Sequence, residues 1–356
     1  MKKSLVYRRK NRKNSSEVEA LNYAQQIVFA PFTFQVIGTM LDFGILQKLD
    51  NENLTQNQIM QLCTLDEYCA NVLLQAAEYA HIIQKSDDGK FSLTKAGECF
   101  LHDEMTIKNF NFMRDVCYLG ANELTLSLKN SEPVGLQKFF VDDKTIYPHV
   151  PTLPQKAKKS WYEFDHYYSD GSFEDVLKII LENSPATIFD IGGNTGKFEL
   201  ACLKFDKKTN LRIIDLPVNK DIALENTNSN RVEFIPFDVL SGNDFPKIFD
   251  TVFMSQFLDC FSKEQAINIL KGIQKSAEPK TKIFILEPVI DNQIFECASF
   301  SLAHISLYFT CLANGNSKMY TQNELLEIIR SANLKLNKIH NNVGKHCYTL
   351  LECETI

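Results

Sequence analysis

The sequence predicts an α/β protein in which a mainly helical N-terminal domain precedes a domain built on a mostly parallel sheet. Two patterns and the break between them predict this fold. The first half carries apolar residues at helical spacing with little turn chemistry. The second half alternates short apolar runs with longer amphipathic stretches, as a parallel sheet covered by helices requires. Because residues 141–159 hold several prolines between the two patterns, we expect domains at residues 1–150 and 151–356.

The composition is that of a globular protein in a reducing compartment. Hydrophobic residues make up 44% and charged residues 23% of the 356 residues, enough for two cores. The ten cysteines include no CxxC pair, which argues against a zinc site or a thioredoxin-like redox pair. No run reaches the roughly 20 apolar residues of a membrane span. We therefore expect a cytoplasmic protein without a membrane segment.

The net charge of −6 argues against a general affinity for nucleic acid. One local exception is a basic cluster at the start of the chain, which we expect to be a solvated tail. Its members are Lys2, Lys3, Arg8, Arg9, Lys10, Arg12 and Lys13.

The N-terminal half predicts three helices followed by a hairpin. Residues 20–49 have helical periodicity, and Thr55 is a plausible N-cap for the next helix. The segment CANVLLQAAEYAHII predicts a third helix, and Asp88-Gly89 marks a turn between two short strands. Helix, helix, helix and hairpin is the order of a winged-helix module.

The second half predicts seven strands. Five apolar runs alternate with amphipathic stretches, at residues 187–191, 211–214, 232–235, 251–254 and 282–286. Two more runs, at residues 335–340 and 347–353, are separated only by NNVGKH. A connection this short predicts an antiparallel pair at the end of the sheet.

The strongest local signal is TIFDIGGNTGKFELACLKF, in which a buried strand meets a glycine turn and a helix. Glycines at 192, 193 and 196 permit unusual backbone conformations and close approach of a ligand. The start of the helix offers unpaired N–H donors. Asn194 and Lys197 stand where the G-x-G-x-x-G motif has glycine, which argues against a nicotinamide dinucleotide.

Acidic residues end three successive predicted strands: Asp190, Asp215 and Asp238. Because the carboxyl ends of parallel strands line one edge of a sheet, this edge is predicted to bind a ligand. Asp215 would accept both ribose hydroxyls and Asp238 would accept the amino group of an adenine. The alternative is that each aspartate caps the helix that follows its strand.

With these motifs in view, the chain resembles the two-domain small-molecule O-methyltransferases of the caffeate and acetylserotonin type. The family's DVGGGTG motif is DIGGNTG here, its DLP is Asp215-Leu216-Pro217, and its GDFF-like segment is FDVL at 237–240. The resemblance implies a Rossmann-like, seven-stranded class I methyltransferase domain that uses S-adenosylmethionine. It also implies a winged-helix-like N-terminal domain that forms a homodimer.

The resemblance also implies site residues. The expected contacts to S-adenosylmethionine are Ser172, Asp190, Gly192, Gly193, Gly196, Asp215, Leu216, Asp238, Val239 and Ser255. Ser255 stands where the family has a lysine that contacts the cofactor. The segment FDHYYSDGSFEDVLKII resembles the family's helix that closes over cofactor and substrate. The expected substrate contacts are Phe164, His166, Tyr168, Tyr308 and Met319.

The family's catalytic pair is replaced in this sequence. Asp259 in FLDCFSKEQ occupies the histidine position, and Met319 in KMYT occupies that of the glutamate which orients it. A free carboxylate is a poor base for a phenol, because the proton transfer costs roughly 8 kcal/mol. Burial that raised the pKa of Asp259 would reduce this cost. The candidate catalytic residues are Asp259 and His304, with His166 as a further possible base.

These observations predict a homodimeric methyltransferase of secondary metabolism that acts on a small aromatic or polyketide-like metabolite. Transfer would rely chiefly on positioning of donor and acceptor. No metal is expected, since no Asp/His cluster has ligand spacing. Two alternatives stay open: the same fold with N- or C-methylation or cofactor-assisted decarboxylation, and a winged-helix regulator that senses a ligand.

Overall fold

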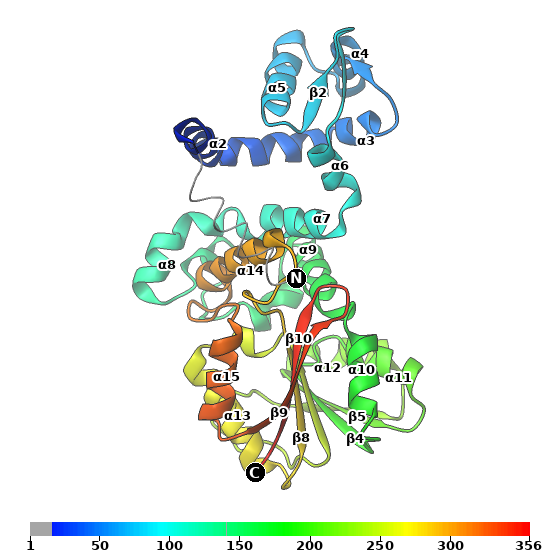
Figure 1. Ribbon diagram of the computed structural model, residues 1–356, viewed down its shortest axis with the longest axis vertical. Coiled ribbons are helices and arrows are strands. Elements are labelled where there is room, and N and C mark those ends of the chain that lie inside the picture. Colours follow the sequence, from blue (N-terminus) through cyan, green and yellow to red (C-terminus); the bar gives the residue numbers. More distant parts are fainter. Residues whose placement is uncertain (1–15, 140) are drawn as a thin grey trace. The chain divides into compact units, whose positions relative to one another are not determined.

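The computed structural model describes residues 16–139 and 141–356, and the chain divides into two compact units, residues 1–114 and 115–356 (Figure 1). The basic cluster at the start of the chain lies outside the described residues. This division falls before the predicted boundary at residue 150, because the intervening segment packs on the sheet unit. The 3-10 helices η2 (Gly120–Glu123) and η3 (Val134–Phe139) and helix α8 (Leu124–Asn130) contact the π-helix η7 (Phe309–Ala313).

The first unit consists of helices and a small antiparallel sheet. Its helices are α2 (Glu17–Asp42), α3 (Ile45–Leu49), α4 (Gln56–Cys63), α5 (Glu67–Tyr79), α6 (Lys95–His102) and α7 (Glu104–Phe112). Its strands are β1 (Leu54–Thr55), β2 (Ile83–Lys85) and β3 (Lys90–Leu93), in the order β1-β3-β2. The predicted helices and hairpin are confirmed. Thr55 caps α4 as expected, and Gly44, with φ of 70°, separates α2 from α3.

The second unit is built on a seven-stranded sheet in the order β6-β5-β4-β7-β8-β10-β9. Its strands are β4 (Thr187–Ile191), β5 (Asn210–Asp215), β6 (Val232–Pro236), β7 (Thr251–Ser255), β8 (Lys282–Glu287), β9 (Lys335–Val343) and β10 (Tyr348–Glu354). The first five are parallel, and β10 is antiparallel to both β8 and β9. All seven predicted strands and the terminal antiparallel pair are confirmed.

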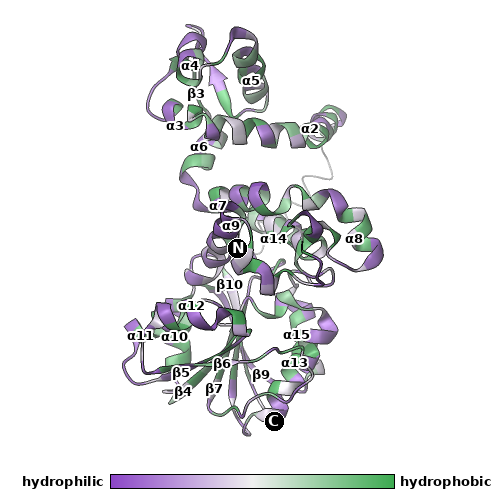
Figure 2. Ribbon diagram, turned by 180° about the vertical axis from the view of Figure 1, so that it is seen from behind, coloured by the Kyte–Doolittle hydropathy of each residue, from purple (hydrophilic) through white to green (hydrophobic). Residues whose placement is uncertain are grey.

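Helices cover both faces of this sheet. Helices α10 (Phe173–Leu181), α11 (Lys197–Phe205) and α12 (Lys220–Thr227) lie on one face, and α13 (Lys263–Ser276) and α15 (Gln322–Ser331) on the other (Figure 1). Helices α9 (Gln155–Asp170) and α14 (Glu296–Tyr308) lie beyond the carboxyl end of the parallel strands. Figure 2 shows hydrophobic strands enclosed between helices that turn hydrophilic residues outward. In this arrangement a ligand-binding site can form at the carboxyl edge of the sheet.

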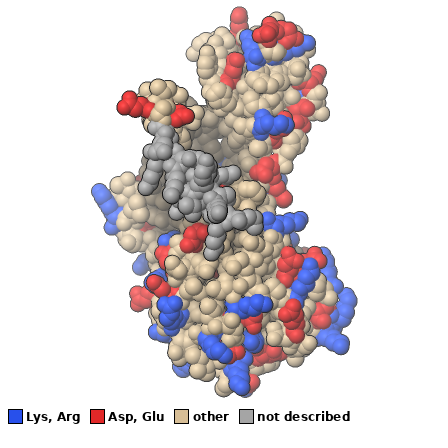
Figure 3. Space-filling model, viewed as in Figure 1, with Lys and Arg blue, Asp and Glu red and all other residues tan. Residues whose placement is uncertain are grey.

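The surface of the second unit carries charges of both signs. Figure 3 shows lysines and arginines interspersed with acidic residues over the face of this unit that it draws. Within residues 16–139 and 141–356, no helix is long and apolar enough to cross a membrane.

Candidate active site

The glycine turn lies at the carboxyl end of β4, where the chain enters α11. Gly192 and Gly196 have φ of 82° and 78°, values that favour glycine. A Cβ on Gly192 would lie 2.3 Å from Cδ2 of Phe257, and a Cβ on Gly193 would lie 2.8 Å from Oδ2 of Asp190. The turn therefore needs glycine both for its backbone conformation and for its close packing.

Asp215, at the end of β5, fastens the glycine turn to the next strand. Its Oδ2 accepts a hydrogen bond from the backbone N–H of Asn194 at 2.7 Å, and its Oδ1 accepts from the N–H of Leu216 and from Nδ2 of Asn219. Burial raises the pKa of Asp215. Asp238 is exposed, and its Oδ1 accepts from the N–H of Leu240 in a turn.

The helix-cap alternative for the three aspartates is wrong. Helix α11 begins after Gly196 and α12 begins after Asn219. Asp238 is followed by a turn and extended loop, not by a helix. The three carboxylates therefore stand at strand ends without a capping role, as a ligand-binding edge requires.

Helix α9 lies against the glycine turn. Oδ2 of Asp165 accepts a hydrogen bond from Nδ2 of Asn194 at 3.0 Å, and Nε2 of His166 lies 3.4 Å from Oγ1 of Thr195. Burial raises the pKa of Asp165 to about 6. Burial acts to lower the pKa of His166, but Asp170 and Asp165 outweigh it and raise that pKa. His166, expected at the substrate, thus contacts the glycine turn.

The junction between α9 and α10 places Ser172 under the β9–β10 turn. Ser172 is fully buried, and among the described residues its hydroxyl has no hydrogen-bond partner. A Cβ on Gly344 would lie 2.4 Å from that hydroxyl oxygen. The His346 ring of the same turn lies 4.4 Å from the ring of Tyr167 and 6.3 Å from that of Tyr168. His346 lies in no motif that would have singled it out from the sequence.

Asp259, in the segment after β7, and Glu287, at the end of β8, form a buried carboxyl pair. Asp259 lies in the 3-10 helix η6 (Leu258–Cys260) and is 3% exposed, and Glu287 ends β8 and is 2% exposed. Burial raises the pKa of Asp259 to about 7, and the charge of Asp165 adds to this effect. Burial and the charge of Asp259 raise the pKa of Glu287 well above its ordinary value.

One oxygen of Glu287 is held by the backbone. Its Oε1 accepts hydrogen bonds from the N–H groups of Phe257 and Leu258, at 3.1 and 2.8 Å. Glu287 was not predicted from the sequence. The available signal was an acidic residue at the end of the apolar run KIFILE, the same pattern that singled out Asp190.

Several buried polar atoms around this pair lack hydrogen-bond partners among the described residues. They are Oδ1 of Asp259, Oε2 of Glu287, Oγ of Ser255, Nε2 of Gln256 and the hydroxyls of Tyr147 and Tyr348. Burial raises the pKa of both tyrosines most, and the charge of Asp259 raises it further. Buried polar atoms without partners are costly, so such a cluster is typical of a site that binds a polar ligand.

Aromatic residues of α9 and α14 form an apolar wall. Nε1 of Trp161 donates a hydrogen bond to the hydroxyl of Tyr308 at 2.7 Å, and both residues are buried. The rings of Phe164 and Tyr168 lie 4.9 Å apart. Met319 is also buried, and its N–H donates to Oγ of Ser306.

His304 lies on the exposed face of α14. Its Nδ1 lies 2.8 Å from the carbonyl oxygen of Phe300, and its ring stacks on that of Phe300 at 3.9 Å. Tyr308, one helical turn later, is buried. His304 was expected to line the acceptor pocket together with Tyr308, but His304 is exposed and Tyr308 is buried.

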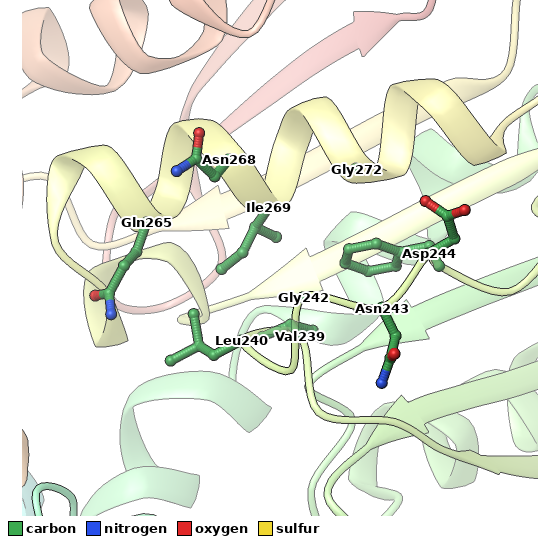
Figure 4. Close-up of a pocket in the computed structure, with 10 residues that line it drawn as sticks. Val239, Leu240, Gly242, Asn243, Asp244, Gln265, Asn268, Ile269 and Gly272 are labelled. Atoms are coloured by element: carbon green, nitrogen blue, oxygen red, sulfur yellow. The ribbon is translucent and has the colours of Figure 1, made fainter.

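A groove of about 350 Å³ lies between the loop after β6 and helix α13 (Figure 4). Its lining residues are Val239, Leu240, Gly242, Asn243, Asp244, Phe245, Gln265, Asn268, Ile269 and Gly272. Asp244 is the only acidic residue among them, and it pairs with Lys275. The groove therefore carries little acid–base chemistry, in contrast to the pair formed by Asp259 and Glu287.

Comparisons with known proteins assign this architecture to a family. A Dimerisation2-like domain matches residues 22–91, and an O-methyltransferase domain matches residues 171–333. The chain belongs to the two-domain O-methyltransferases. The L-tyrosine C(3)-methyltransferase of Streptomyces lavendulae is 22% identical over 276 residues, which cover 75% of this chain and 74% of that protein.

Solved structures share the whole fold of this O-methyltransferase. The mitomycin 7-O-methyltransferase MmcR aligns with a TM-score of 0.73 and 15% identity, over 95% of this chain and 98% of the other. The human N-acetylserotonin methyltransferase, in complex with S-adenosylmethionine, aligns with a TM-score of 0.66 and 14% identity, over 96% and 99%. The protein is thus an S-adenosylmethionine-dependent methyltransferase of a family that acts on small metabolites.

The residues at the sheet edge fit this cofactor. The glycine turn leaves room for close approach of a ligand, and Asp215 offers carboxylate oxygens beside it. The unpaired hydroxyl of Ser172 is a further buried polar group at this edge. S-adenosylmethionine supplies an electrophilic methyl group when bound, so the chain's own residues have to orient the donor and prepare the acceptor.

Proposed function

We propose that this enzyme methylates an acidic hydroxyl of a small aromatic or polyketide-like metabolite, with Asp259 as the base and Glu287 as its partner. The observation that carries the proposal is the buried carboxyl pair. Because the pKa of Asp259 is raised to about 7, the cost of taking a proton from a phenol near 10 falls from roughly 8 to about 4 kcal/mol. An acceptor more acidic than a simple phenol reduces this cost further.

The donor occupies the edge formed by β4, β5 and β6 in this proposal. Its contacts are Ser172, Asp190, Gly192, Gly193, Gly196, Asp215, Leu216, Asp238, Val239 and Ser255. The hydrogen bonds from Asn194 to Asp165 and Asp215 support a preorganised donor loop. His166 belongs to this donor side, because its ring contacts Thr195.

The acceptor lies between the aromatic wall and the carboxyl pair. Phe164, Tyr168 and Tyr308 supply apolar surface, and the unpaired hydroxyls of Tyr147 and Tyr348 supply hydrogen bonds. A flat ring that carries several oxygens suits this mixture of surfaces. Met319 closes the wall at the position where the family has its glutamate. This chemistry supports a role in secondary metabolism.

We infer that the protein works as a cytoplasmic homodimer. The match to a Dimerisation2-like domain supports a dimer, as does the exposed apolar surface of α2. Its members, all at least half exposed, are Val18, Leu21, Tyr23, Ile27, Val28, Phe29 and Phe32. The order of helices and hairpin in this unit is that of a winged helix used for association. The ten cysteines, all free, support a reducing compartment.

C-methylation of a phenol is the second candidate, favoured by the similarity to an L-tyrosine C(3)-methyltransferase. The same base would serve it, because a phenolate directs negative charge to its ortho carbon. Incubation with S-adenosylmethionine and a panel of phenols and hydroxyquinones, followed by mass spectrometry and NMR, separates the two. Methylated oxygen supports the proposal, methylated carbon supports the second candidate, and methylation of amines alone contradicts both.

A further inference from the structure

A second buried carboxyl pair lies beneath the glycine turn. Asp190 is the last residue but one of β4 and is 3% exposed, and Glu199, in the first turn of α11, is fully buried. Within the described residues, no side-chain hydroxyl, amide or amine donates to either oxygen of Glu199. The side chain that its carboxyl meets is Asp190. Two ionised carboxylates cannot remain in contact in such a place, so the pair shares a proton.

Within the part of the chain that the structure describes, no cation is among the groups that act on Asp190 or Glu199. The charged groups that act on Asp190 are Glu199 and Asp215, and both are acids. Burial raises the pKa of Asp190 to about 7 and that of Glu199 well above its ordinary value. Asp215 comes from β5, and Cys202 is the next titratable group along α11. Asp165 and His166 of α9 contact the outer side of the turn, through Asn194 and Thr195.

The described residues that pack beside Glu199 include aromatic rings. The ring of Phe198, beside Glu199, packs on Phe253 of β7 at 4.2 Å and on Phe173 of α10 at 5.5 Å. Helix α12 presents Ala223 and Thr227 to the turn at Gly196. The pair is therefore an acidic site in apolar surroundings, where an unneutralised negative charge is costly.

The pair lies directly under the surface that we assign to the donor. Oδ2 of Asp190 is so close to Gly193 that a Cβ there would meet it at 2.8 Å. S-adenosylmethionine carries two positive charges, an α-ammonium and a sulfonium. A cation that binds at the turn would lie beside two carboxyl groups that share a single proton.

We propose that Asp190 and Glu199 form a proton-sharing pair that recognises the positive charge of the methyl donor. When the donor binds, its positive charge stabilises both carboxyl groups in their ionised form, and the shared proton is released to solvent. The proton moves from a carboxyl oxygen to buffer, and no other bond changes. The inference rests on the proposed placement of the donor at this edge.

Calorimetric titration near pH 7, in buffers of different ionisation enthalpy, measures the released proton. Three ligands separate the sources of charge: S-adenosylmethionine carries both cations, S-adenosylhomocysteine only the ammonium, and 5′-methylthioadenosine neither. We expect up to about one proton released per donor bound and none with 5′-methylthioadenosine. Release with S-adenosylhomocysteine assigns the ammonium as the recognised cation, and its absence assigns the sulfonium. Because binding favours the ionised pair, affinity for the donor should rise with pH, by up to about tenfold per pH unit.

The Glu199→Gln variant keeps the shape and donates an amide N–H to Asp190, but it removes the titratable proton. It should lose the proton release and the pH dependence, whereas Glu264→Gln, an exposed residue of α13, should keep both. Donor binding without proton release, or equal release with 5′-methylthioadenosine, would overturn the inference, as would unchanged release by Glu199→Gln. If Glu199→Gln does not fold, the titrations of the wild-type protein with the three ligands are the test. Failure of the wild-type protein to bind any of the three would instead refute the donor site itself.

Discussion

The Asp259→Asn variant tests the proposed base most directly. Asparagine has nearly the same shape as aspartate, but it cannot accept a proton from the acceptor. We expect kcat to fall by about 100- to 10,000-fold, the usual contribution of a positioned general base. The glycine turn is held by the bond between Asn194 and Asp215, not by Asp259. The Kd for S-adenosylmethionine should therefore change by less than about twofold.

The pH profile of the wild-type enzyme gives an independent measure. Burial raises the pKa of Asp259 to about 7, so at lower pH the residue is protonated and cannot act as a base. The rate should fall by about tenfold per pH unit below that value. In Asp165→Asn the acidic charge that adds to the effect of burial on Asp259 is gone. The pKa of Asp259 should then fall, and the acidic limb of the profile should move to lower pH.

The assay follows methyl transfer by chromatography of the product, together with calorimetric titration of the cofactor. Asp244→Asn is the matched control, since this aspartate is exposed and pairs with Lys275. An Asp259→Asn enzyme with a near-normal rate and an unchanged pH profile would rule out Asp259 as the base. Positioning alone would then carry the reaction, and substitutions at Tyr168 or Tyr308 should be the damaging ones.

Four further predictions follow from the same structure. Asp215→Ala should weaken binding of S-adenosylhomocysteine by about 1–3 kcal/mol, and equal affinity in calorimetry would contradict its role. Gly193→Ala should reduce donor affinity and the Tm together, because the new Cβ would meet Asp190 and Ile213 at 2.8 and 3.0 Å; a normal Tm with normal affinity would exclude this clash. Phe32→Asp, on the apolar surface of α2, should give a monomer in light scattering at micromolar concentration, and a persistent dimer would place the interface elsewhere. His304→Gln should leave kcat nearly unchanged, because His304 is exposed and its ring bonds to the Phe300 carbonyl; a large loss would restore it as a base.

Much of the fold was predictable because it depends on local periodicity. The seven apolar runs form seven strands. The connection NNVGKH is so short that the two strands it joins have to pair antiparallel. Thr55 could be identified as a cap because its capping box lies within a few residues of the chain. The glycine turn could also be located, since the φ values of Gly192 and Gly196 favour glycine.

Other features depend on contacts between distant parts of the chain. The segment before residue 150 joins the sheet unit because η2 and η3 pack on η7, far along the sequence. His166 and His304 both lie on helices, and only packing placed one against the glycine turn and left the other exposed. Side-chain exposure on a helix is decided by what covers it, and a single sequence does not contain that information.

Three features can be read from the sequence alone: the order of the strands along the chain, the glycine turn and the replacement of the family's histidine by Asp259. What Asp259 can do depends on the folded chain. Parallel pairing of β7 with β8 brings Glu287 to the same sheet edge, and burial then raises the pKa of both acids. A pKa depends on solvent exclusion and on charges within a few ångströms, and both are properties of the folded chain.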